Sequence, residues 1–150
     1  MREVELLLQY YSGKRAGDRQ TYYKWSVCEA DRPLLDSLRR EAASWTDLQL
    51  LCLSQGYADD GEILSFMLSD AKGYTTEKLM TVAGILRSVM VKRIVWHWLL
   101  LVDGEPGMEV QRLMASLDAS VAALLDLLRS QLSPSSSPRS YTGPREVPPV

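Results

Sequence analysis

The sequence predicts an all-α fold built around a central hydrophobic helix. Two observations carry this prediction. Apolar residues recur at intervals of three and four through most of the first 132 positions, and alternating patterns typical of strands are almost absent. The chain has 150 residues, of which 46% are hydrophobic, so it can bury one sizeable core. We therefore expect one helical bundle domain over 1–132. The Ser- and Pro-rich segment 133–150 is expected to be a disordered tail.

The first predicted helix covers residues 2–12. Val4, Leu7, Leu8 and Tyr11 fall at the i, i+3, i+4 and i+7 positions of an amphipathic helix. Gly13 and Gly17 follow and are expected to end it. We expect the next residues, 13–30, to form a polar link that is held to the domain by its aromatic side chains.

The second predicted helix begins near Asp31, a possible N-cap, and runs to about Ser54, with Pro33 in its first turn. Four apolar or small residues in it are spaced by four, four and three: Leu34, Leu38, Ala42 and Trp45. Such a ridge is typical of helices that dock into a hydrophobic groove. Any amphipathic core helix has similar spacing, and on spacing alone the core interpretation is favoured.

A shorter helix is expected next, with Asp59 or Asp60 as its cap and Gly73 at its end. Its apolar residues are Ile63, Leu64, Phe66, Met67 and Leu68.

The central helix is expected to begin at Thr75 or Thr76 and to merge into the apolar run Ile94 to Val102. Its apolar face holds Leu79, Val82, Ala83, Leu86, Val89 and Met90. The residues 103–107, DGEPG, predict a turn, after which periodic apolar residues predict a last long helix or a kinked pair.

Composition excludes several classes of partner. The net charge of −2 and the absence of a dense Lys/Arg block argue against nucleic acid. Cys28 and Cys52 stand in unrelated contexts, and no secretory signal is recognisable, so a reducing intracellular location is the default expectation. The longest apolar run, Ile94 to Val102, is too short for a transmembrane anchor.

The sequence contains no pattern that argues for an enzyme, a cofactor or a metal site. His97, the only histidine, lies between Trp96 and Trp98, and a packing role is favoured over a catalytic base. Phosphate-loop, dinucleotide-binding, nucleophile-elbow and zinc motifs are absent. The carboxylates Asp59, Asp60 and Glu62 are better explained as helix-capping charge.

Three segments, in this order, resemble homology regions of the B-cell lymphoma-2 family of apoptosis regulators. REVELLLQYYSGKRAG, residues 2–17, is similar to the fourth region, and LLDSLRREAASW, residues 34–45, to the third, with Leu38 as the signature leucine. SDAKGYTTEKLMTVAGILRSVMVKRI, residues 69–94, is similar to the first region. The second region and the terminal membrane anchor are not recognisable. This divergence resembles the viral members of the family.

The resemblance implies a fold and a function. The fold is a B-cell lymphoma-2-like bundle whose central hydrophobic helix is wrapped by amphipathic helices. The function is anti-apoptotic: a hydrophobic groove sequesters pro-apoptotic proteins by their amphipathic homology-three helix. The groove residues that the resemblance implies are Trp45, Leu48, Leu53, Leu64, Leu68, Thr75, Glu77, Lys78, Thr81 and Ile85.

Two of these positions depart from the family pattern. Lys78 replaces the arginine that pairs with the ligand's aspartate, and it lacks the planar fork for two parallel hydrogen bonds. Glu77 replaces a glycine and would repel that aspartate. We therefore expect weak or selective ligand binding, with a selective ligand range. We also expect a cytoplasmic location in a host cell, with recruitment to mitochondria through partners.

Two other functions stay open. A related fold can act as a homodimeric inhibitor of host signalling with its groove blocked by the second copy. The chain can also be an unrelated helical assembly protein.

Overall fold

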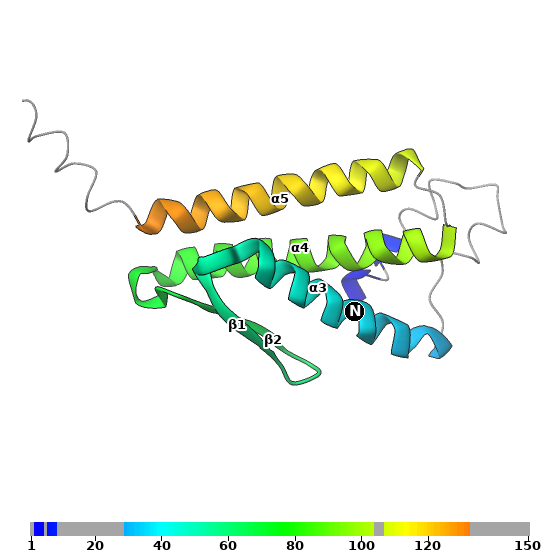
Figure 1. Cartoon of the computed structure of the whole chain (residues 1–150), viewed down its shortest axis with the longest axis horizontal. Coiled ribbons are helices and arrows are strands. Elements are labelled where there is room, and N and C mark those ends of the chain that lie inside the picture. The colour runs from blue at the N-terminus through cyan, green and yellow to red at the C-terminus, as the bar shows by residue number, and fades with distance from the viewer. Residues whose placement is uncertain (1, 5, 9–28, 104–106, 133–150) are drawn as a thin grey trace, which may run out of the picture.

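In the computed structural model the described residues are 2–4, 6–8, 29–103 and 107–132, and they form a mostly helical domain with one β-hairpin (Figure 1). The helices are α3 (Arg32–Leu50), α4 (Thr76–Asp103) and α5 (Met108–Leu132). Three short 3-10 helices, η1 (Glu29–Asp31), η2 (Leu51–Leu53) and η3 (Ala71–Gly73), flank them. Residues 2–4 and 6–8 are also helical. The expected link over 13–30 lies largely outside the described residues, and the expected tail over 133–150 lies entirely outside them.

α4 is the central helix, as predicted, and it begins and ends close to the expected residues. α5 lies along one side of α4, while α3 and the hairpin lie on the other side (Figure 1). Thr75 caps α4, because its Oγ1 accepts the backbone N–H of Lys78 at 3.3 Å. The last helix is also confirmed as one continuous element, α5.

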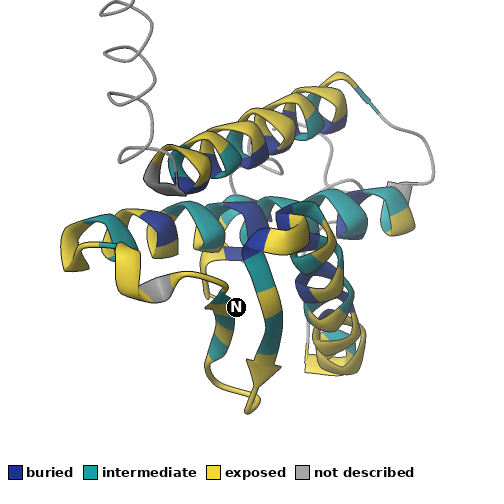
Figure 2. Cartoon of the chain, turned by 60° about the vertical axis from the view of Figure 1, so that its left-hand side comes forward, coloured by how far each residue is buried: buried dark blue, intermediate teal, exposed yellow. Residues whose placement is uncertain are grey.

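The core lies where α4 meets its neighbours, and the buried faces of α3 and α5 turn toward α4 (Figure 2). Near the C-terminal half of α4, Ile94, Trp98 and Leu99 pack with residues of α3, α5 and the N-terminal segment. At its other end, Val82 packs with apolar residues of α3, η2 and α5: Leu50, Leu53, Leu124 and Leu128. Burial of each Leu-sized side chain contributes roughly 1.5–3 kcal/mol.

Residues 34–45, the segment with the apolar ridge, pack against the core of their own domain as part of α3. In α3 the buried residues are Leu35, Leu38, Ala42, Ala43, Thr46 and Leu50. Leu34 is exposed and Trp45 is half-buried. The core interpretation of this helix therefore holds, and the expected ridge is shifted by about one residue. Asp31 occupies the N-cap position, but its side chain makes no capping hydrogen bond.

The prediction of a short helix after Asp59 is wrong, because the chain from Ser54 to Leu68 forms a β-hairpin. β1 (Ser54–Asp59) pairs antiparallel with β2 (Leu64–Leu68), with a register irregularity between Ser54 and Tyr57. Side chains of β2 alternate between half-buried and exposed, which is the period of a strand. Gly61 at the turn has φ +96°, a conformation that glycine adopts without steric cost. The Asp60-Gly61 pair is thus a turn signal and no helix cap.

The carboxylate of Asp60 stabilises this turn. Its Oδ1 accepts the backbone N–H groups of Glu62 at 2.9 Å and Ile63 at 2.7 Å. These hydrogen bonds hold the pKa of Asp60 below its ordinary value. Aspartate was expected here as a helix cap, and it performs the same hydrogen bonding in a turn.

Candidate functional site

A groove of about 550 Å³ runs between β2 and the N-terminal two-thirds of α4. Its lining is mainly apolar, with charged side chains from α3, α4, the hairpin turn and the N-terminal segment. The apolar lining residues are Ile63, Leu64, Phe66, Leu68, Leu79, Val82, Ala83, Leu86, Met90, Val91 and Ile94, and the charged ones are Glu3, Arg39, Glu62 and Arg87.

The α4 wall of the groove is one continuous stripe of the central helix. Its residues begin at Leu79 and recur at helical spacing through Leu86 to Ile94, about four turns. α5 and α3 pack against other faces of α4, so this stripe is covered only in part. Leu79, Leu86 and Val91 are consequently half-buried, and they present apolar surface to the groove.

The opposite wall is the hairpin strand β2 together with the turn before it. The two-stranded sheet leaves one edge of β2 without a partner strand among the described residues. Leu64, Phe66 and Leu68 point to the domain side, since all three are half-buried and pack against core residues. Tyr57 of β1 lies behind Phe66, with 6.0 Å between the ring centroids.

Arg39 of α3 connects the hairpin turn to the helices. Its Nη2 lies 3.0 Å from Oδ1 of Asp59, and its Nη1 donates to the carbonyl oxygen of Gly61 at 2.6 Å. The same Asp59 oxygen accepts the backbone N–H of Gly61 at 2.9 Å. One guanidinium therefore connects both Asp59 and Gly61 of the turn to α3.

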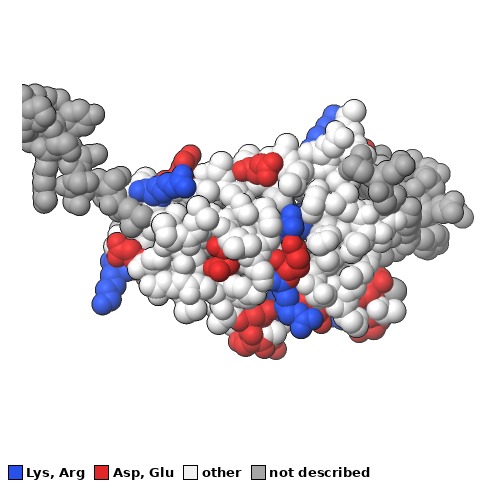
Figure 3. Space-filling view, viewed as in Figure 1, with Lys and Arg blue, Asp and Glu red and all other residues white. Residues whose placement is uncertain are grey.

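Charge at the groove is mixed in sign. Glu3, Glu62 and Arg87 are exposed. Within the described ranges, Arg87 makes no ion pair. Over the face seen in Figure 3, acidic and basic side chains are intermixed with wide uncharged areas.

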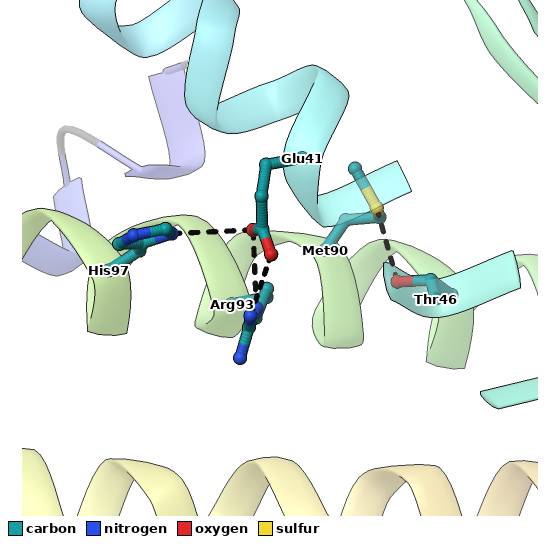
Figure 4. A network of polar contacts seen from close by, with 5 residues as sticks. All are labelled: Glu41, Thr46, Met90, Arg93 and His97. Atoms are coloured by element: carbon teal, nitrogen blue, oxygen red, sulfur yellow. Dashed lines mark hydrogen bonds and ion pairs between the residues drawn. The ribbon is translucent and has the colours of Figure 1, made fainter. Parts of the chain in front are cut away.

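A polar cluster fastens α3 to α4 beside the groove (Figure 4). Arg93 of α4 binds the Glu41 carboxylate of α3 through two hydrogen bonds, of 2.7 and 3.3 Å. Its guanidinium carbon also lies 4.5 Å from the ring centroid of Trp45 and 4.6 Å from that of Trp96. Nδ1 of His97 lies 3.3 Å from the same carboxylate. His97 thus takes part in the contact between α3 and α4.

Glu41 has a pKa below its ordinary value, because its polar partners lower the pKa more than burial raises it. Burial raises the pKa of this carboxyl group, but the hydrogen bond and charge of Arg93, with further contributions from His97, together outweigh burial. In the same region, Oγ1 of Thr46 donates to the sulfur of Met90 at 3.5 Å. Met90, a groove residue, is thereby tied to the α3 interface.

Only two of the ten implied groove residues, Leu64 and Leu68, line this groove. Leu53 is buried in the core, while Trp45 and Ile85 pack beside α5 residues. The other five are exposed or half-buried outside the groove: Leu48, Thr75, Glu77, Lys78 and Thr81. Eight of the ten therefore do not line this groove, because the segment containing Leu64 and Leu68 is a hairpin and α4 turns a different stripe toward it.

The sequence-based expectation missed Phe66, Leu86 and Arg87 as groove residues. The sequence did predict that Leu79, Val82, Ala83, Leu86 and Met90 lie on one apolar face of the central helix. It did not predict that this face forms a wall of the groove. Apolar residues at every second position, Leu64, Phe66 and Leu68, were the signal for the other wall, although Met67 between them is apolar as well.

The described residues contain no group of His, Cys, Asp and Glu side chains that could hold a metal ion. None of the described helices combines the length and apolar character needed to cross a bilayer. No protein-family model, no characterised protein and no solved structure matches the chain.

Proposed function

We propose that the protein is an anti-apoptotic regulator which captures the amphipathic homology-three helix of a pro-apoptotic partner in the β2–α4 groove. The single observation that carries the proposal is the groove itself. It follows about four turns of the central helix and is mainly apolar. Helix-in-groove recognition needs such a stripe, because a ligand helix presents apolar residues at i, i+3, i+4 and i+7. The resemblance in residues 2–17, 34–45 and 69–94 supports the apoptotic assignment.

The energetics suit a short ligand helix. Each buried Leu-sized anchor contributes roughly 1.5–3 kcal/mol, so four anchors contribute about 6–12 kcal/mol. Ordering a disordered segment costs about 2–5 kcal/mol, and association costs more. Net binding in the micromolar range therefore needs a polar contribution as well.

Arg87 is the residue that fits this polar role. It lies at the groove, it is exposed, and it has no acidic partner within the described ranges. Its planar fork can hold a ligand carboxylate through two hydrogen bonds, worth about 1.5–3 kcal/mol. Lys78 and Glu77 do not line the groove. We therefore propose Arg87 in the role first expected of Lys78.

The proposed setting is the cytoplasm of a host cell, with partners at mitochondria, as for the viral members of the family that the sequence resembles. We also propose a selective ligand range, because acidic residues lie at the groove. Glu3 and Glu62 disfavour ligand helices that carry acidic residues opposite them.

Calorimetry against a panel of pro-apoptotic homology-three peptides tests this function. We expect at least one peptide to bind wild type, and Leu86→Arg to weaken it by more than about 30-fold, since a charge enters the apolar stripe. Met80→Arg is the matched control, because Met80 is 71% exposed on the same helix and does not line the groove. Failure of every peptide, or equal weakening by both variants, would contradict the proposal.

Light scattering on the same samples distinguishes the proposed peptide-binding function from the homodimer hypothesis. The proposed function predicts the mass of one chain without peptide and of a one-to-one complex with it. A dimer that ignores the peptides would favour a groove blocked by a second copy.

A further inference from the structure

We propose that Arg39 is a positioning residue for the β2–α4 groove: by tying the hairpin turn to α3, it holds the distal half of the hairpin away from α4 and keeps the groove open before a ligand arrives. The positional part of this inference stands on geometry alone. The consequence for ligand binding rests on the proposed function.

Every polar tie between the hairpin strands or turn and a long helix goes to α3, within the described residues. Ser54 at the base donates to Oδ1 of Asp47 at 2.6 Å. Tyr57 in the middle of β1 shares a hydrogen bond of 2.8 Å with Ser44. Arg39 binds the turn at the far end. No hydrogen bond or ion pair joins residues 54–68 to α4 within the described residues. The polar contacts that position the hairpin against the long helices therefore come from α3, and they act together with the apolar packing of Leu64, Phe66 and Leu68.

The Arg39 tie is the strongest of the three by its chemistry and burial. It combines an ion pair with Asp59 and a hydrogen bond to the carbonyl oxygen of Gly61. The side chains of Arg39 and Asp59 are only 16% and 18% exposed, so water and salt screen the pair less than a surface pair. Arg39 also reaches the groove lining from its position on α3.

Leu64 and Phe66 of β2 pack in part against the core, but the turn itself has little besides Arg39 to hold it. Apolar packing anchors the base, where Leu53 is buried and Leu68 packs against the same cluster. Toward the turn, Ile63 is 64% exposed and the Glu62 side chain is exposed as well. An isolated two-stranded hairpin is marginally stable in water.

Two partly hydrated apolar walls attract each other across the groove. When the Arg39 tie is removed, we expect the Leu64 end of β2 to move toward the stripe that contains Leu86 and Met90. The groove is then closed for part of the time. A ligand that needs the open form binds with an apparent Kd raised by the inverse of the open fraction. That loss falls on the association rate, because the complex itself is unchanged.

Spin labels measure the wall separation without any ligand. We would place them at Ile63→Cys and Met80→Cys, both exposed positions, in a background where Cys28 and Cys52 are changed to Ser. Wild type should give one narrow distance distribution, and Arg39→Ala a broader one shifted to shorter distances. Arg40→Ala is the matched control, because Arg40 is the exposed neighbour on α3 and makes no ion pair in the described ranges. Identical distributions for wild type and Arg39→Ala would overturn the proposal.

Stopped-flow binding of a homology-three peptide that binds wild type tests the consequence. We expect Arg39→Ala to lower the association rate about tenfold, with the dissociation rate unchanged, if the open fraction falls to about a tenth. Asp59→Asn should act in the same direction, and the double variant should lose little more than Arg39→Ala alone. Asparagine keeps an oxygen that can accept the Gly61 N–H, so this substitution removes mainly the charge that pairs with Arg39.

A change confined to the dissociation rate would overturn the positioning role, because it would mean direct contact between Arg39 and the ligand. If no peptide bound wild type, the proposed function would fail, and the spin-label distances would still decide whether Arg39 positions the hairpin.

Discussion

Replacing Arg93 with alanine should destabilise the domain by about 2–3 kcal/mol, through loss of the α3–α4 fastening. The two hydrogen bonds to Glu41 are charge-assisted and would contribute about 1.5–3 kcal/mol if fully buried. Because the Glu41 side chain is 36% exposed, we discount this contribution to about 1 kcal/mol. Contacts with the Trp45 and Trp96 rings add about 0.5–1 kcal/mol each.

Urea unfolding followed by tryptophan fluorescence and circular dichroism measures this loss. Arg87→Ala is the matched control on the same helix, and we expect it to stay within about 0.5 kcal/mol of wild type. Arg93→Lys should fall between the two, since lysine keeps the charge but not the planar fork. A loss below about 1 kcal/mol for Arg93→Ala, or an equal loss for Arg87→Ala, would refute the assigned role.

Two further perturbations follow from backbone conformation and from protonation. Gly84→Ala should stabilise the domain by about 0.5–1 kcal/mol, because this helical glycine has open space at its Cβ position, whereas Gly61→Ala should destabilise it by about 1–2 kcal/mol at φ +96°. Thermal melts of both variants check the opposite signs, and a stabilised Gly61→Ala would contradict the turn geometry. Glu41 has a lowered pKa in the folded state, so its contribution is complete above its ordinary pKa of 4.5 and is lost as the pH falls through the folded-state value. The stability gap between wild type and Glu41→Gln, measured by urea unfolding, should therefore narrow from pH 7 to about pH 3, and a constant gap would exclude this linkage.

The long helices were predictable because their apolar periodicity extends over many turns. α4 and α5 contain enough repeats that errors at single residues do not change the pattern. For α3 the spacing also predicted the helix, but its buried face is centred on Leu35 and Leu38 instead of Leu34 and Leu38. The elements that pack against α3 decide which of its residues are buried, and the local sequence pattern holds no information about those elements.

The hairpin was missed because a short apolar segment fits both periods. Ile63, Leu64, Met67 and Leu68 have helical spacing, while Leu64, Phe66 and Leu68 alternate as in a strand. Tertiary contact decided between them, since Arg39 of α3 binds the turn from 22 residues away. One wall of the groove is this hairpin. The site was therefore predictable only as far as the apolar stripe of α4.

Methyl chemical-shift mapping of a homology-three peptide on the labelled full chain tests the central claim most directly. Occupancy of the β2–α4 groove predicts shifts concentrated at Leu64, Leu68, Leu86 and Val91, whose side chains line it. Leu48, which is 69% exposed outside the groove, should not shift. Binding that shifts Leu48 and leaves the groove methyl groups unchanged would contradict the claim.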